Sequence, residues 1–135
     1  MKIQFDVSGL PPKKDGANSM WRKGSELARL KSLRKAASEA MKDLPLVEGN
    51  IFIKIQVFAD PSKGDLDNFI TGICDGLMAA HPRTPIDLAQ WQDVPEPAKP
   101  QHAICYSDDI LINRISAVRF VPGASGCHYL IEMEW

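Results

Sequence analysis

The sequence predicts one α+β domain, with a mixed sheet of four to five strands and two main helices in the order β-α-β-α-β-β. Four short stretches have the apolar alternation or β-branched content of strands. Two longer stretches repeat apolar residues every three or four positions, as a helix does. The 135 residues have the size of a single domain, 1–135, and they contain no internal repeat and no long linker.

The strands are expected at 2–8, 51–58, 110–121 and 127–135. Residues 51–58 give the clearest signal, because isoleucine or valine occupies every second position and these side chains share one face. A Pro-Gly pair separates the last two stretches, which predicts that they form a hairpin.

The helices are expected at 25–41 and 68–80, where leucine, isoleucine, alanine and methionine recur at helical spacing. Either Asp67 or Asn68 is a natural N-cap for the second helix. Its two glycines predict a close approach of another element, which is a packing role.

Residues 81–105 form a proline-rich insertion loop with no sustained periodicity. The segment contains five prolines, which break both helices and strands. A loop of this length inside a compact domain is usually functional or disordered.

Composition is typical of a soluble globular protein, with 24% charged and 44% hydrophobic residues. Neither a secretory signal nor a membrane span is visible, so we expect a cytoplasmic protein without membrane partners. The three cysteines have no Cys-x-x-Cys spacing, which favours free, reduced thiols. The three histidines lack finger-like spacing as well, so zinc is disfavoured.

Basic residues are concentrated near the start of the chain. The segment 13–42 has nine basic and three acidic residues, a net charge of +6, although the whole chain carries −1. Such a segment can neutralise DNA phosphates, and it can equally be the solvated face of a helix. The candidates for DNA contact are Lys13, Lys14, Arg22 and Lys23.

Two acidic clusters are the strongest indication of chemistry. Asp65 and Asp67 stand two residues apart before the second helix, and Asp108-Asp109 follows about forty residues later. Carboxylates grouped in this way can hold a hard divalent cation, and Mg²⁺ can activate water for attack on a phosphodiester. The alternative is that these aspartates only cap helices and form turns.

The acidic clusters belong to a longer pattern that resembles the RusA family of Holliday junction resolvases. The matching segments are Gly64-Asp65-Leu66-Asp67-Asn68-Phe69, Cys74-Asp75-Gly76-Leu77, Tyr106-Ser107-Asp108-Asp109, and an early Leu10-Pro11-Pro12 with Asn18 and Trp21. Their order agrees with the family over nearly the whole chain, which is more specific than any single segment.

This resemblance implies a homodimeric endodeoxyribonuclease that uses Mg²⁺, or Mn²⁺ as a substitute, to cut four-way DNA junctions. Such enzymes, of phage and prophage type, act in recombination and repair. By position, the catalytic metal ligands would be Asp65, Asp67 and Asp109. The supporting residues would be Asn68, Asp75 and Asp108.

Two features depart from the family pattern. Four residues after the second aspartate, the family typically has a catalytic lysine, whereas this chain has Thr71. Lys63 could reach the same phosphate from the preceding turn. The second departure is the length of the 81–105 loop.

Three hypotheses remain open from the sequence. The first is a Mg²⁺-dependent junction endonuclease with two active sites in a twofold dimer. The second is a RusA-like protein that binds branched DNA without cutting it, marked by Thr71. The third is a metal-free interaction module whose acidic residues are caps.

Overall fold

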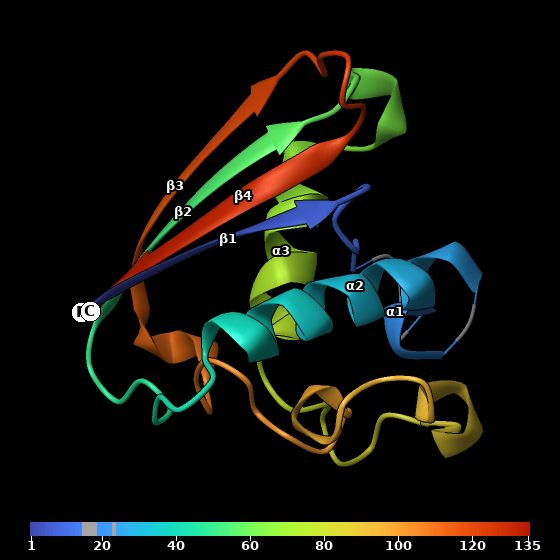
Figure 1. Ribbon diagram of the computed structural model, residues 1–135, viewed down its shortest axis with the longest axis vertical. Coiled ribbons are helices and arrows are strands. Elements are labelled where there is room, and N and C mark those ends of the chain that lie inside the picture. The colour runs from blue at the N-terminus through green and yellow to red at the C-terminus, as the bar shows by residue number, and fades with distance from the viewer. Residues whose placement is uncertain (15–18, 23) are drawn as a thin grey trace.

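The computed structural model describes residues 1–14, 19–22 and 24–135, and it confirms a single α+β domain with a mixed four-stranded sheet. The strands are β1 (Lys2–Ser8), β2 (Ile51–Phe58), β3 (Ile112–Phe120) and β4 (His128–Glu134). Their order across the sheet is β1-β4-β2-β3 (Figure 1). β3 runs parallel to β2, and β4 runs antiparallel to both of its neighbours.

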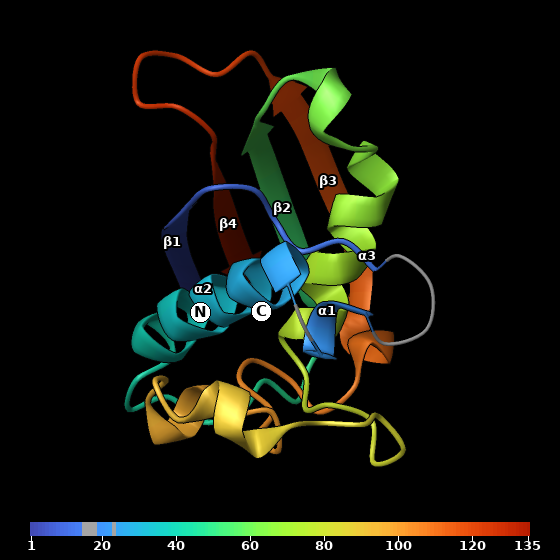
Figure 2. The same cartoon turned by 90° about the vertical axis from the view of Figure 1, so that its right-hand side faces the viewer.

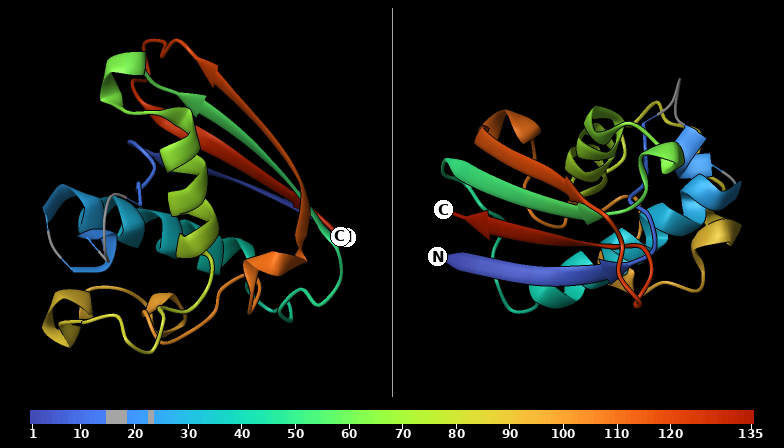
Figure 3. Two further views of the ribbon diagram at one scale, coloured as in Figure 1. Left: turned by 180° about the vertical axis from the view of Figure 1, so that it is seen from behind. Right: turned by 90° about the horizontal axis from the view of Figure 1, so that it is seen from above.

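The helices are α1 (Ser19–Arg22), α2 (Gly24–Ala40) and α3 (Leu66–Gly76). α2 and α3 cover one face of the sheet, and no helix or strand of the described residues covers the other face (Figure 3). No helix within the described residues is long and apolar enough to cross a membrane.

The prediction that the last two strands form a hairpin is wrong. β4 lies between β1 and β2, whereas β3 lies on the far side of β2. The apolar residues of β4 explain this position, because Tyr129, Ile131 and Met133 are fully buried and need neighbours on both sides. β3 is more exposed and occupies an edge of the sheet.

The main core lies between the sheet and the two long helices. The predicted inner face of β2 is confirmed, since Ile53, Ile55 and Val57 are at most 1% exposed. They pack in one cluster with Leu33 of α2 and Ile73 of α3. Burying each of these side chains contributes about 1.5–3 kcal/mol, so this layer holds α3 against β2 and β3.

α3 begins two residues earlier than expected, with Asp65 as its N-cap instead of Asp67 or Asn68. The cap position is defined by the backbone, because the Asp65 side chain makes no capping hydrogen bond. The predicted close approach at the helix glycines is confirmed. A Cβ at Gly72 would collide with the carbonyl oxygen of Pro12, and one at Gly76 would press on Leu33.

The 81–105 segment contains no strand or α-helix, as expected, but it is packed and contributes to a second core. It contains two short 3-10 turns, η2 (Leu88–Trp91) and η3 (Glu96–Ala98). Trp91 is 1% exposed and its ring centroid lies 6.0 Å from that of Trp21. The loop therefore closes over α1 and the start of α2.

Arg34 of α2 is 0% exposed and ties this loop to the rest of the domain. Its guanidinium lies 5.2 Å from the ring centroid of Trp21 and donates five hydrogen bonds, all to backbone carbonyls. The acceptors are the carbonyl oxygens of Gly76, Met78, Ala98, Lys99 and His102. Burial lowers the pKa of Arg34 to about 10, which still leaves the side chain charged at neutral pH.

Candidate functional site

The two acidic clusters lie at opposite ends of the sheet. Asp65 and Asp67 follow the end of β2 at the start of α3, whereas Asp108 and Asp109 directly precede β3. Because β2 and β3 are parallel, α3 must run back along the sheet between them, and Figure 2 shows this path. The C-terminal end of α3, not its start, therefore comes close to Asp109.

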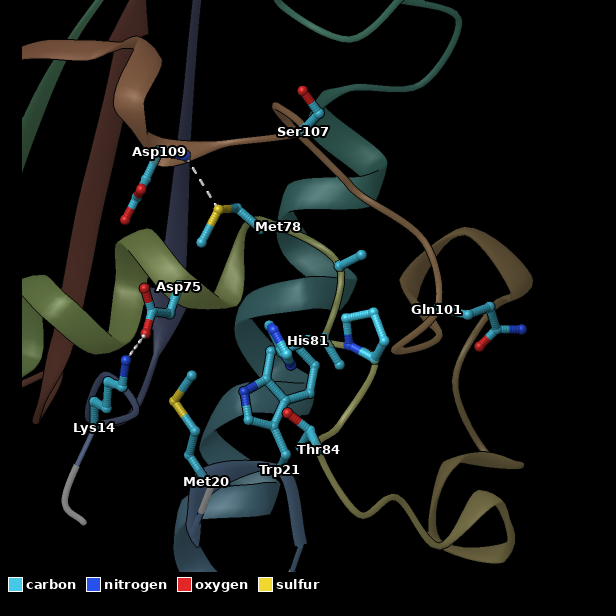
Figure 4. A pocket seen from close by; sticks show the side chains of 13 residues that line it. Lys14, Met20, Trp21, Asp75, Met78, His81, Thr84, Gln101, Ser107 and Asp109 are labelled. Carbon is cyan, nitrogen blue, oxygen red and sulfur yellow. Dashed lines mark hydrogen bonds and ion pairs between the residues drawn. The ribbon is translucent and has the colours of Figure 1, made fainter. Parts of the chain in front are cut away.

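Asp75, in the last turn of α3, is the carboxylate that the fold brings to Asp109. The negative charges of Asp75 and Asp109 both raise the pKa of the same lysine, Lys14. The charge of Asp75 also contributes to the raised pKa of Asp109. Both side chains line a hollow of about 650 Å³ (Figure 4). We refer to Asp75 and Asp109 as the acidic pair.

Lys14 forms an ion pair with one member of the acidic pair, Asp75. Its Nζ is 2.8 Å from Oδ2 of Asp75, and this hydrogen-bonded ion pair raises the pKa of Lys14. The segment before it packs directly on α3, because Gly72 leaves room for the carbonyl of Pro12. The sequence thus positions an ammonium group at the acidic pair through a glycine in the facing helix.

Asp108 and Asp109 have different environments. Asp108 accepts a hydrogen bond from the Ile110 backbone N–H at 3.0 Å and caps the 3-10 turn η4 (Asp109–Leu111). Asp109 faces the hollow, where partial burial raises its pKa and the like charges of Asp75 and Asp108 add to the effect. Asp108 therefore serves its own backbone turn, and its supporting role at a metal site stays a prediction.

Of the predicted residues at the other end, Lys63, Asp65 and Asp67 are exposed, and Asn68 is partly buried. Asp67 accepts a hydrogen bond from the Asn68 backbone N–H at 3.0 Å, and Lys63 ends the short turn η1 (Pro61–Lys63). The Thr71 hydroxyl donates to the Asp67 carbonyl at 3.0 Å, so the residue in the position of the family lysine is neutral and bonded within its own helix.

The three predicted metal ligands do not meet within one chain. Asp67 and Asp75 are eight residues apart, so about 12 Å of helix axis separates Asp67 from the acidic pair. Among the residues that the structure describes, no three or more His, Cys, Asp or Glu side chains are grouped to hold a metal ion. Metal binding by Asp65, Asp67 and Asp109 stays a prediction.

The basic segment is only partly available to a ligand. The structure excludes Arg34 from the basic residues that could contact DNA, because its side chain is fully buried. Arg29 and Lys31 are also engaged, in ion pairs with Glu26 and Asp93 at 2.6 Å each.

The described candidates for DNA contact are Lys13, Lys14 and Arg22. The side chain of Arg22 is exposed, and that of Lys13 is partly exposed. Lys23 and the Asn18 of the family pattern lie outside the described residues.

The walls of the hollow come from segments far apart in the sequence. Trp21 and Met20 belong to α1, His81 and Gln101 belong to the loop, and the acidic pair closes one side (Figure 4). A hollow of about 650 Å³ with a few polar groups has the size of a small-molecule site and can accept a group as large as a nucleotide.

The cysteines take no part in this chemistry. All three are free, and burial raises the pKa of Cys74 and of Cys105 to about 12. These two thiols therefore stay protonated and unreactive at neutral pH.

Comparison with models of known protein families gives no match for this chain, and no curated protein is significantly similar to it.

Proposed function

We propose that this protein is a Mg²⁺-dependent, structure-specific endonuclease that hydrolyses phosphodiesters at four-way DNA junctions in recombination and repair. The observation that carries the proposal is the acidic pair, Asp75 and Asp109, which lines an open hollow beside a basic side chain. Two separate segments of the RusA-like pattern supply these carboxylates, and the early Leu-Pro-Pro segment leads directly into Lys14.

The acidic pair fits a divalent cation. Mg²⁺ is usually bound by one or two carboxylates, with waters and substrate phosphate oxygens completing its coordination. Lys14 already places a positive charge at Asp75, and the raised pKa of Asp109 reflects in part a negative field that a cation would offset. When bound there, Mg²⁺ or Mn²⁺ would supply an activated water and stabilisation of charge on the phosphate.

The chain's own residues would have distinct roles. Asp75 and Asp109 would hold the cation, and the Lys14 ammonium can exchange its carboxylate partner for a DNA phosphate. Lys13 adjoins Lys14 in the chain, and Arg22 ends α1, whose Met20 and Trp21 line the hollow. Both would bind the backbone of the DNA arms. Contacts of this kind follow the shape of a junction without reading its bases, and they weaken as salt increases.

The test is cleavage of a synthetic four-way junction with Mg²⁺ and with EDTA, using the parent, Asp109→Asn and Asp43→Asn. We expect the parent to cut only with Mg²⁺, and Asp109→Asn to lose about a hundredfold or more in rate. Asp43→Asn makes the same charge change after α2, where φ is 64° and asparagine is tolerated, so it should cut normally. An inactive parent, or an active Asp109→Asn, would contradict the proposal.

A second candidate function is junction binding without cleavage. It is favoured by Thr71, whose hydroxyl is bonded to the Asp67 carbonyl and offers no charge to a phosphate. In the same experiment, a mobility shift of the junction with no product in Mg²⁺ would select this function.

A further inference from the structure

His81 lines the hollow, but the proposed function gives it no role. It is the first residue of the 81–105 loop, and its exposed side chain shares the hollow with the acidic pair (Figure 4). Because the length of this loop departs from the family pattern, the resemblance implies nothing about the histidine. Its role has to be inferred from its own contacts.

The backbone around His81 is held on both sides. The Ala80 N–H donates to the Pro100 carbonyl at 2.8 Å, which joins the start of the loop to its end. The Thr84 N–H donates to the His81 carbonyl at 2.8 Å and closes a β-turn over 81–84. Pro82 stands at the second position of this turn, where its fixed φ is favoured. The ring is therefore carried by a preorganised segment.

The ring of His81 has a defined tautomer. Its Nδ1 accepts a hydrogen bond from the Arg83 backbone N–H at 3.1 Å. A ring nitrogen that accepts a hydrogen bond carries no proton, so the neutral imidazole has its proton on Nε2. Within the described residues, this Nε2–H has no acceptor. A side chain of the hollow thus has one donor that the protein does not use.

A phosphate held at the acidic pair needs hydrogen-bond donors for the oxygens that do not face the cation. Lys14 supplies one from the start of the chain, since its Nζ is already 2.8 Å from Oδ2 of Asp75. His81 lines the same hollow from the loop, so it can supply a second donor. A neutral N–H suits this place, because a further positive charge would be repelled by Mg²⁺ at the acidic pair.

We propose that His81 binds a phosphate oxygen of the DNA strand at the acidic pair, with its Nε2–H acting as a neutral hydrogen-bond donor. The Arg83 N–H keeps Nδ1 unprotonated, so the ring donates a hydrogen bond and transfers no proton. That the phosphate belongs to DNA rests on the proposed function, whereas phosphate binding in the hollow does not.

Two substitutions separate this role from a purely structural one. In His81→Gln the amide nitrogen can take the place of Nε2, but the acceptor for the Arg83 N–H is lost. In His81→Asn the amide oxygen can take the place of Nδ1 and keep the turn, but the donor is lost. We expect His81→Asn to slow single-turnover cleavage of a junction by about tenfold to a hundredfold, and His81→Gln to recover much of that loss. Equal rates for the two variants, or the reverse order, would overturn the proposal.

The matched control is His102→Gln, which makes the same exchange in the same loop. The His102 ring is engaged with Glu96, whose Oε1 lies 3.1 Å from Nε2. We expect this variant to cut like the parent, and all three variants to keep the parent's circular dichroism. A loss in His102→Gln as large as that in His81→Asn would overturn the assignment to His81.

The pH dependence of the effect distinguishes a neutral donor from a general acid. The other charged side chains that line the hollow, Lys14, Asp75 and Asp109, are common to the parent and His81→Asn. The ratio of the two cleavage rates should therefore stay constant between about pH 7 and about pH 9, because a neutral Nε2–H keeps its proton. A ratio that falls about tenfold per pH unit would show proton transfer from His81 and overturn the proposal.

Phosphate binding is also measured without cleavage, by NMR of the ring nitrogens in the parent labelled at histidine. We expect His81 to have its proton on Nε2, and this N–H to shift when inorganic phosphate is added with Mg²⁺, while His102 and His128 do not respond. A proton on Nδ1, no shift, or equal shifts of all three rings would overturn the proposal. A parent that never cuts, but shows the shift at His81, would support phosphate binding and count against the proposed function alone.

Discussion

Replacing Arg34 by methionine should strongly destabilise the protein, because it removes the group that ties the 81–105 loop to α2 and α3. Arg34 donates five hydrogen bonds at 2.5–2.9 Å to backbone carbonyls, and none of its surface is exposed. Methionine has a similar length and fills most of the space beside Trp21, so the change isolates the loss of the donors.

The size of the effect follows from the burial of these bonds. The bonds to Gly76 and Ala98 are fully buried, and each carbonyl left without a donor costs about 1–3 kcal/mol. The other three bonds are only partly buried, so water can replace the guanidinium there. We expect a loss of about 4 kcal/mol in the free energy of unfolding, and a fall of about 12 °C in Tm.

The measurements are urea unfolding and amide hydrogen exchange, with Lys35→Met as the control. Lys35 is the exposed neighbour on the same helix, and its replacement should change the free energy of unfolding by less than about 0.5 kcal/mol. Exchange should speed up most in 81–105 of the Arg34→Met variant. Equal stability of Arg34→Met and the parent would refute the reasoning, since the five bonds would then contribute nothing.

The remaining predictions concern DNA. In an active parent, Lys63→Ala should slow single-turnover cleavage by about a hundredfold if this residue supplies the charge that Thr71 lacks, and Thr71→Lys should then change little. A faster Thr71→Lys enzyme with a normal Lys63→Ala would reverse that assignment, and no effect of either would remove it. Separately, Lys13→Ala with Arg22→Ala should reduce the salt dependence of junction binding by about one unit of slope per lost phosphate contact. An unchanged slope would mean that these side chains do not touch the DNA backbone.

The strands and helices were predictable because their signals are local. The alternation in 51–58 identified the buried face of β2, and the same residues are buried in the structure. The order of strands was not predictable in this way, since periodicity says which face of a strand is buried and not which strands are neighbours. The fully buried inner face of β4 and the exposed residues of β3 become meaningful only once the sheet is assembled.

The sequence predicted that the candidate site contains aspartates, but it did not predict which of these aspartates lie close together. The sequence pattern selected Asp109 and named Asp75 only as supporting, whereas the fold brings these two together. Knowing that β2 and β3 are parallel neighbours would have been enough to place Asp75 near Asp109, because the connecting helix then ends close to the start of β3. The burial of Arg34, one of the nine basic residues of segment 13–42, could not be predicted, because its carbonyl partners lie more than forty residues away in sequence.

The pairing of β1 with β4 has a consequence for how the chain folds. β1 has no other strand partner among the described residues, and the pairing joins Lys2 to Glu134 and Ser8 to His128. β2, α3 and β3 can associate before β4 is in place. β1, and the edge of β2 that pairs with β4, have no strand partner until β4 inserts between them. Closing a loop of that length is slow and leaves apolar strand edges open meanwhile. We therefore expect the insertion of β4 to limit the folding rate, and aggregation during synthesis to begin at the uncovered edge of β2.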